Sequence, residues 1–184
     1  MARAMSQYLL AAAGKDRPGI VAAVTKILYK HGCNLADSAM TRLASEFAML
    51  LIFQAPARFN PAGMRGDLEE VEKRLGLLLS LKPLRAAETR PVKPRGRPYV
   101  LSVYGADRPG IVYRVSRLLA SKGVNITDVS THRTAEKKKA GYVLLLEVEL
   151  PPRRRPADLD RSLQRLVKPL GLHVSLRPIE VSRL

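Results

Sequence analysis

The hexapeptide Asp16-Arg17-Pro18-Gly19-Ile20-Val21 returns letter for letter as Asp107-Arg108-Pro109-Gly110-Ile111-Val112. The two copies lie 91 positions apart, and between Gly14 and Asp37 the same offset gives 12 identities in 24 positions. Solenoid repeats have periods of roughly 20–50 residues, so a period this long indicates two duplicated globular domains. A chain of 184 residues has room for both.

Each copy begins with a pattern typical of a strand followed by a helix. Residues 8–13 are apolar and bounded by Gly14, which predicts a strand. The hexapeptide then predicts a helix start, with Asp16 near the N-terminus and Pro18 in the first turn. Gly32 is expected to end the helix, whose apolar face comprises Ile20, Val21, Val24, Ile27 and Leu28. Copy two repeats this pattern at the same offset.

Two further strands, a second helix and a last strand are expected in each copy. Both third strands end at a proline, Pro56 and Pro151, but at an offset of 95. Four extra residues therefore belong to the hairpin of copy two, near residues 136–139. A second helix is predicted in each copy, in which Leu68, Val71 and Leu75 match Leu163, Leu166 and Leu170.

The resulting order is βαββαβ, which predicts the α+β class. We expect two ferredoxin-like domains, each an antiparallel four-stranded sheet with two helices on one face. Their predicted limits are residues 5–86 and 97–184. Residues 87–96, rich in proline and basic side chains, are expected to form an extended linker.

A βαββαβ unit with Gly-x-Asp-Arg-Pro-Gly-Ile-Val at its first strand–helix turn resembles an ACT domain, and the resemblance covers both halves. ACT domains bind amino acids and regulate enzymes or transcription. Two such domains with nothing else attached resemble the subfamily of glycine cleavage system transcriptional repressors. The resemblance implies a regulatory protein that senses a small amino acid, with glycine as a candidate, and acts through a partner protein on transcription or on an enzyme.

The strand–helix turn is the predicted ligand site. Unpaired N–H groups at a helix N-terminus attract a carboxylate, and an aspartate there can accept a hydrogen bond from a ligand ammonium group. The resemblance adds the asparagine that opens the second strand. The predicted binding residues are Gly14, Asp16, Arg17, Pro18, Gly19 and Asn34 in copy one, and Gly105, Asp107, Arg108, Pro109, Gly110 and Asn125 in copy two.

Two structural alternatives accompany this prediction: Asp16 as a helix cap, and Asn34 as a turn former after a glycine. The ligand also stays open, because serine-binding ACT domains often carry His and Asn where this chain has Gly14 and Asp16. A helix of about 14 residues separates the turn from Asn34 by roughly 20 Å. A second domain must therefore bring Asn125 beside Asp16, so we expect the site at a domain interface, within the chain or in a homodimer.

No enzyme motif occurs, and the histidines at 31, 132 and 173 do not recur between the copies. His31, near a helix end, is expected to favour the helix dipole. The single cysteine, Cys33, aligns with Val124 and is expected to be a small buried apolar residue. We therefore predict no enzyme, no metal and no cofactor.

The formal net charge of +16 suggests an acidic partner. The basic clusters, in the linker, at residues 137–139 and at residues 153–155, are predicted to be dispersed, so direct nucleic-acid binding is an alternative rather than the favoured function. A scaffold that has lost its ligand is a second alternative. No stretch approaches the ~20 apolar residues of a membrane span. Residues 8–10 match mid-chain residues 99–101, which favours a strand over a signal peptide and predicts a cytoplasmic protein.

Overall fold

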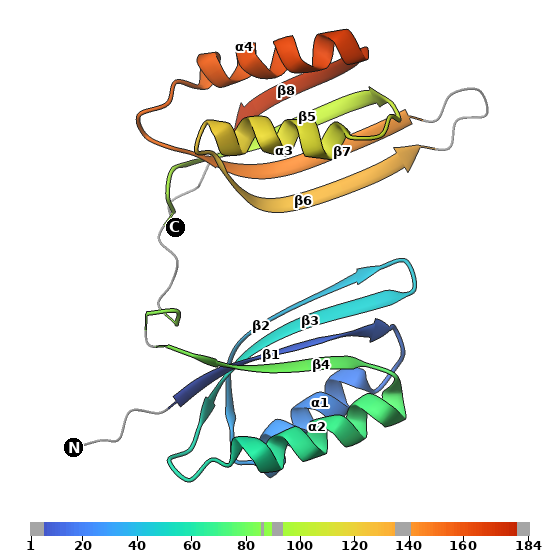
Figure 1. Cartoon of the computed structure of the whole chain (residues 1–184), viewed down its shortest axis with the longest axis vertical. Coiled ribbons are helices and arrows are strands. Elements are labelled where there is room, and N and C mark those ends of the chain that lie inside the picture. Colours follow the sequence, from blue (N-terminus) through green and yellow to red (C-terminus); the bar gives the residue numbers. More distant parts are fainter. Residues whose placement is uncertain (1–5, 86, 90–93, 135–140, 180–184) are drawn as a thin grey trace. The chain divides into compact units, whose positions relative to one another are not determined.

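The computed structural model describes residues 6–85, 87–89, 94–134 and 141–179 (Figure 1). The chain divides into two compact units, Met1–Pro91 and Val92–Leu184, called domain 1 and domain 2 below. The division falls within the segment expected to be a linker. Residues 90–93 of that segment lie outside the described residues.

Domain 1 has the predicted βαββαβ order. Its sheet has the strand order β2-β3-β1-β4, and all neighbouring strands are antiparallel. The central strand β1 pairs with β3 on one side and with β4 on the other. In chain order its elements are β1 (Ser6–Lys15), α1 (Ile20–Lys30), β2 (Asn34–Leu43), β3 (Glu46–Ala55), α2 (Pro61–Leu75) and β4 (Leu78–Leu84).

Domain 2 repeats this topology with the strand order β6-β7-β5-β8, again antiparallel throughout. The prediction of two ferredoxin-like domains is therefore confirmed. The elements of domain 2 are β5 (Arg97–Ala106), α3 (Ile111–Ser121), β6 (Asn125–Thr134), β7 (Gly141–Leu150), α4 (Pro156–Val167), the short 3₁₀ helix η1 (Lys168–Leu170) and β8 (Leu172–Pro178).

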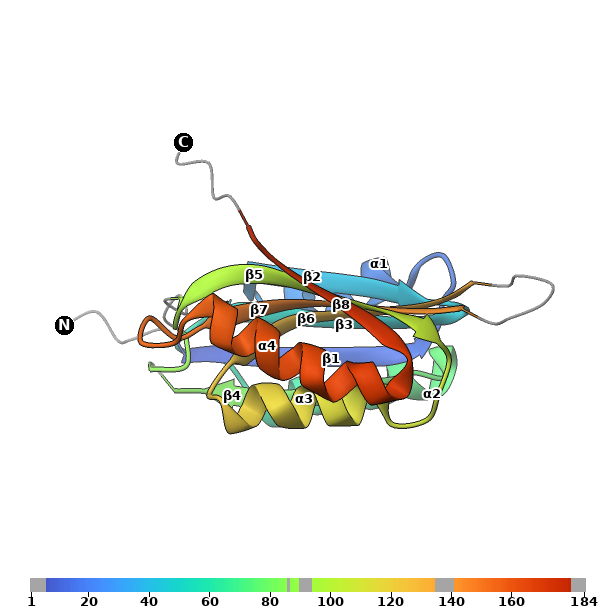
Figure 2. The same cartoon turned by 90° about the horizontal axis from the view of Figure 1, so that it is seen from above.

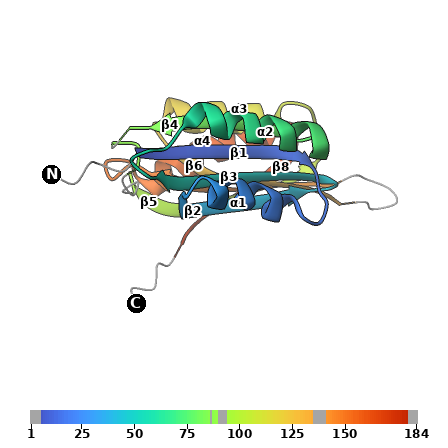
Figure 3. The same cartoon turned by 90° about the horizontal axis from the view of Figure 1, so that it is seen from below.

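In both domains the two helices lie side by side on one face of the sheet. Figure 2 shows this for α3 and α4, and Figure 3 shows it for α1 and α2. The inward residues of the strands, such as Leu10 and Phe53 in domain 1, are fully buried beneath these helices with Ile20 and Val24 of α1. Each core is therefore closed within its own βαββαβ unit, and the turns at the sheet ends are left available for a site.

The leucines of domain 2 that match those of the second helix of domain 1 differ in burial. Leu163 is fully buried, but Leu166 and Leu170 are only partly buried. The buried positions beside Leu163 are Leu159 and Val167. Leu170 does not follow the spacing of α4, because the α-helix ends at Val167 and Leu170 belongs to η1.

The longer hairpin of copy two is confirmed by the strand limits. In domain 1, β2 ends at Leu43 and β3 begins at Glu46, so two residues join them. In domain 2, β6 ends at Thr134 and β7 begins at Gly141, so six residues join them, which is four more. The basic residues 137–139 fall in this segment and lie outside the described residues.

Candidate functional site

The repeated hexapeptide forms the connection between the first strand and the first helix of each domain. The helix begins later than predicted, at Ile20 in α1 and Ile111 in α3. Pro18 therefore lies in the turn before the helix rather than in its first turn. The helix N-cap is Gly19, with φ of 92°, and its counterpart Gly110 has φ of 85°. This left-handed conformation disfavours any residue with a Cβ, which explains why both copies have glycine there.

The glycine that precedes the turn is needed for packing. A Cβ on Gly14 would lie 2.8 Å from Leu77 Cδ2, and a Cβ on Gly105 would lie 2.7 Å from Leu172 Cδ2. The residue just before the last strand in domain 1, and the first residue of the last strand in domain 2, thus lie against this glycine. Its recurrence follows from the fold, whether or not a ligand approaches the same backbone.

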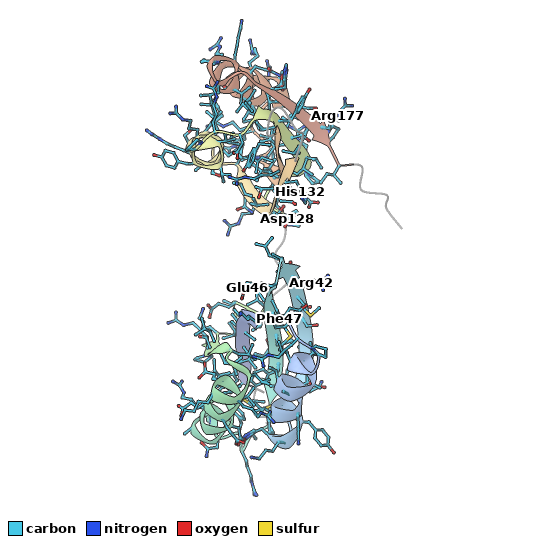
Figure 4. The ribbon with its side chains drawn as sticks, turned by 90° about the vertical axis from the view of Figure 1, so that its right-hand side faces the viewer. Arg42, Glu46, Phe47, Asp128, His132 and Arg177 are labelled. Atoms are coloured by element: carbon cyan, nitrogen blue, oxygen red, sulfur yellow. The ribbon has the colours of Figure 1, made fainter. Side chains whose placement is uncertain are left out.

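The aspartate of the turn forms an ion pair that recurs in both domains. Asp16 Oδ2 lies 3.3 Å from Arg42 Nη1, and Asp107 Oδ2 lies 2.9 Å from Arg133 Nε. No described side chain caps α1 or α3, so the alternative of Asp16 as a helix cap is wrong. Both arginines stand near the end of the second strand; Figure 4 labels Arg42 beside Phe47, its partner in register on β3.

Sequence reasoning missed these two arginines. They are related by the same offset of 91 residues, five positions beyond Asp37, where the aligned segment was taken to end. Extending the alignment along the second strand would have found the pair. The structure shows that each arginine faces the aspartate of the turn, a contact that the alignment alone does not give.

The arginine that follows the turn aspartate makes different contacts in the two domains. In domain 1, the guanidinium of Arg17 donates a hydrogen bond from Nη2 to the carbonyl oxygen of Leu75, the last residue of α2. In domain 2, Arg108 instead lines a pocket at the turn. The guanidinium of domain 1 is thus used to tie the turn to α2, whereas that of domain 2 is presented to the pocket.

The pocket of domain 2 has a volume of about 600 Å³ and contains four of the predicted residues. Asp107, Arg108, Pro109 and Gly110 line it, with Arg133 and Tyr142 at its wall. The hairpin that joins β6 and β7 leaves the sheet at the same end, because Ala106 pairs with Gly141. Within this pocket the structure brings together the turn, the start of α3 and the ends of the two neighbouring strands.

Tyr142 is the main chemical difference between the two turns. It pairs in register with Gly105, and the corresponding partner of Gly14 in domain 1 is Phe47. Burial raises the pKa of the Tyr142 phenol, the negative charge of Asp107 raises it further, and Arg133 acts in the opposite direction. Domain 2 thus has a hydroxyl where domain 1 has a buried phenyl ring.

Asn34 and Asn125 lie far from the turns of their own domains. Asn34 pairs with Gln54, whereas Lys15, next to the turn, pairs with Glu46. Eight residues of β3 separate these positions, or roughly 27 Å at about 3.4 Å per residue. The predicted separation within one domain is therefore confirmed. Asn125 Nδ2 donates to Glu149 Oε2 at 3.3 Å.

His31 and Cys33 were expected to have passive roles. His31 lies at the C-terminal end of α1, as expected, but its Nε2 also lies 2.7 Å from Asp67 Oδ2, and Lys30 Nζ lies 2.7 Å from the other oxygen. These contacts tie the end of α1 to α2. Cys33 is partly buried against the core, and burial raises the pKa of its thiol.

Three further polar residues lie on the edge strands of domain 2. Asp128 and His132 lie on β6, an edge strand, and Arg177 lies on β8 at the opposite edge of the same sheet (Figure 4). Within the described ranges, no group of three or more His, Cys, Asp or Glu side chains is placed to hold a metal ion. No described helix is long and apolar enough to cross a membrane.

Comparison with known proteins matches both halves of the chain to one family. Residues 6–82 and residues 99–155 each match a model described as an ACT domain. The chain is 26% identical over 187 aligned residues to the glycine cleavage system transcriptional repressor of Escherichia coli (strain K12), and the match covers 100% of this chain and 96% of the repressor. The bifunctional uridylyltransferase/uridylyl-removing enzyme of Burkholderia orbicola (strain MC0-3) is 24% identical, but the match covers 83% of this chain and 20% of that enzyme.

Two crystal structures have a similar arrangement over almost the whole chain. A protein from Galdieria sulphuraria has a TM-score of 0.77 and 26% identity, with 96% of this chain and 100% of that chain covered. A protein assigned as a glycine cleavage system transcriptional repressor has a TM-score of 0.69 and 19% identity, with 97% and 100% covered. At the second level of identity the similarity shows the fold alone.

Proposed function

Because the chain belongs to the ACT-domain family, we propose that it is a regulatory protein that senses a small amino acid and acts through a partner protein. The observation that carries this proposal is the similarity to a transcriptional repressor over 100% of this chain and 96% of the repressor. The uridylyltransferase match leaves four fifths of that enzyme uncovered and so supports no catalytic role.

The turn pocket of domain 2 is the proposed ligand site. A zwitterionic amino acid has one carboxylate and one ammonium group, and the pocket offers a counterpart for each. The first N–H groups of α3 have no partner within the helix and, with Arg108, would receive the carboxylate. Asp107 would receive the ammonium group, with Arg133 holding its Oδ2 in place.

The asparagine of a second ACT domain would complete the site. Because Asn125 stands at the far end of its own sheet, it cannot reach the pocket of its own domain. An asparagine from another ACT domain, such as that of a second copy of the chain, can do so. The ligand would then favour the arrangement that contains this contact and shift the population of a surface that the partner protein reads.

Calorimetric titration with glycine, serine and the other common amino acids tests the proposal. We expect saturable binding of one small amino acid, weakened in Asp107→Asn and in Asn34→Ala and Asn125→Ala. Asp158→Asn is the matched control, because this aspartate pairs only locally with Arg161 on the surface of α4. The absence of binding for every amino acid would contradict the proposal and favour the scaffold alternative.

A further inference from the structure

A second hollow adjoins the turn pocket along the exposed side of α3. Its volume is about 590 Å³, and it shares Pro109, Gly110 and Tyr113 with the turn pocket. Arg114 and Arg117 line it from α3, and Leu118 and Leu166 contribute apolar surface. The two hollows therefore adjoin each other at the start of α3, and the one along the helix is called the α3 groove below.

The α3 groove is strongly cationic. Arg114 and Arg117 are both exposed and the residues that line the groove include no acidic side chain. The adjoining pocket adds Arg108 and Arg133, and its one carboxylate, Asp107, is already paired with Arg133. The groove and the pocket together therefore keep a net positive charge after the Asp107–Arg133 pair is formed. This charge attracts an anionic group.

The fold does not require this arrangement. At the positions of Tyr113, Arg114 and Arg117, the offset of 91 residues places Ala22, Ala23 and Lys26 in α1. Domain 1 forms the same helix on the same kind of sheet with these smaller or simpler side chains. Tyr113 is 64% exposed and so contributes little to the core, although Arg117 Nη1 lies 3.4 Å from its hydroxyl. The tyrosine and the arginines are therefore better explained by a partner than by folding.

We infer that the α3 groove seats an acidic segment of the partner protein, with apolar side chains of that segment against Leu118 and Leu166. Exposed tyrosine and arginine beside apolar surface are the residues that dominate binding energy at protein interfaces. The shared residues Pro109, Gly110 and Tyr113 place this segment next to the ligand pocket. We expect a ligand in the pocket and a segment in the groove to alter each other's affinity, because both contact the start of α3.

A protein segment fits the groove better than a nucleic acid does. The basic loop at residues 153–155 lies at the opposite end of the sheet, because Leu150 pairs with Arg97 whereas the turn lies next to the Ala106–Gly141 pair. A phosphate backbone would need a continuous basic path, whereas a short acidic segment needs only the groove.

The experiment measures binding of a short fluorescent peptide of alternating glutamate and leucine to the full chain by anisotropy, at low and at high salt. We expect Arg114→Glu with Arg117→Glu to weaken binding by at least about tenfold and to remove most of its salt dependence. Tyr113→Ala is expected to weaken it without changing the salt dependence. The matched control is Lys26→Glu with Arg74→Glu, which reverses the same charge on the exposed surface of domain 1 and is expected to leave binding nearly unchanged.

An equal loss in the control pair would overturn the inference, because attraction would then depend on total charge alone. Tighter binding of a single-stranded oligonucleotide of the same charge, lost in the same α3 variant, would also overturn it and assign the groove to nucleic acid. The inference rests on the proposed function for its partner, but the peptide is added without an amino acid. If the α3 variant still binds the amino acid and binds the peptide as tightly as the unchanged protein does, the groove alone is refuted. If the protein binds the peptide but no amino acid, the ligand site alone is refuted.

Discussion

Replacement of Gly19 or Gly110 by alanine should destabilise one domain and leave the other unchanged. Each glycine has positive φ, and a Cβ there would meet nothing within 4 Å at Gly19 and only Arg114 Nε, at 3.9 Å, at Gly110. No steric clash therefore contributes, and the whole effect comes from the backbone conformation. A residue with a Cβ in the left-handed region costs about 1–2 kcal/mol, which changes the folded-to-unfolded ratio roughly 5–30-fold.

Hydrogen exchange followed by mass spectrometry can assign this loss to a domain. In Gly19→Ala, the slowest amides of β1 and β3 should exchange roughly 5–30-fold faster, while those of β5 and β7 serve as an internal control; Gly110→Ala should give the reverse pattern. Asparagine tolerates positive φ, so Gly19→Asn should lose less than Gly19→Ala. Unchanged exchange in the alanine variants, or an asparagine variant as unstable as the alanine variant, would refute the conformational explanation of the repeated glycine.

Three further predictions concern single side chains. Hydrogen bonds from Lys30 and His31 lower the pKa of Asp67 below its ordinary value of 3.8. The contribution of Asp67 to stability is therefore present above pH 3.8 and is lost as the pH falls through the lower pKa of the folded state. Asp67→Asn should flatten the acid limb of the stability curve of domain 1, measured by urea unfolding. Asp107→Asn should lower the pKa of Tyr142 toward its ordinary value of 10.0, because the negative charge of Asp107 raises it. The pKa is measured from phenolate absorbance, with Tyr142→Phe as the reference. An unchanged pKa would contradict the proximity of the two groups. Leu163→Ala should lower the free energy of unfolding by roughly 2–5 kcal/mol. Leu166→Ala should lower it clearly less, since Leu163 is fully buried and Leu166 is only partly buried. Equal losses would contradict the observed buried face of α4.

The order of helices and strands could be predicted from the sequence because the two copies show the same hydrophobic spacing at matching positions. Each copy therefore indicates the same element boundaries. The offset change from 91 to 95 even located the longer hairpin between Thr134 and Gly141. The first helix was predicted to begin too early, since aspartate and proline are typical of a first helical turn. Here the left-handed glycine separates Pro18 from the helix. Composition identifies the residues of such a turn but does not determine the φ angle that ends it.

The parts of the site that could not be predicted depend on contacts distant in sequence. Arg17 reaches a carbonyl oxygen 58 residues away, and nothing in its neighbourhood distinguishes it from Arg108. Tyr142 faces the turn only because β7 pairs with β5 in one particular register. A one-residue change of register would turn this side chain to the other face of the sheet. The sequence therefore placed the turn correctly but could not show that the two turns are chemically different.

This difference changes what the duplication says about function. Residues that both copies retain are candidates for a shared ligand site, but most of those in the turn have a structural explanation. Gly14 and Gly105 permit close packing, Gly19 and Gly110 permit positive φ, and the turn aspartates pair with an arginine of the second strand. Identity between the copies is thus what the fold alone would preserve. The features that the fold does not demand, the Arg108 guanidinium at the pocket, the phenol of Tyr142 and the basic side of α3, all belong to domain 2. We therefore expect domain 2 to carry the turn and the groove proposed to bind, and the asparagine of another ACT domain to complete the site.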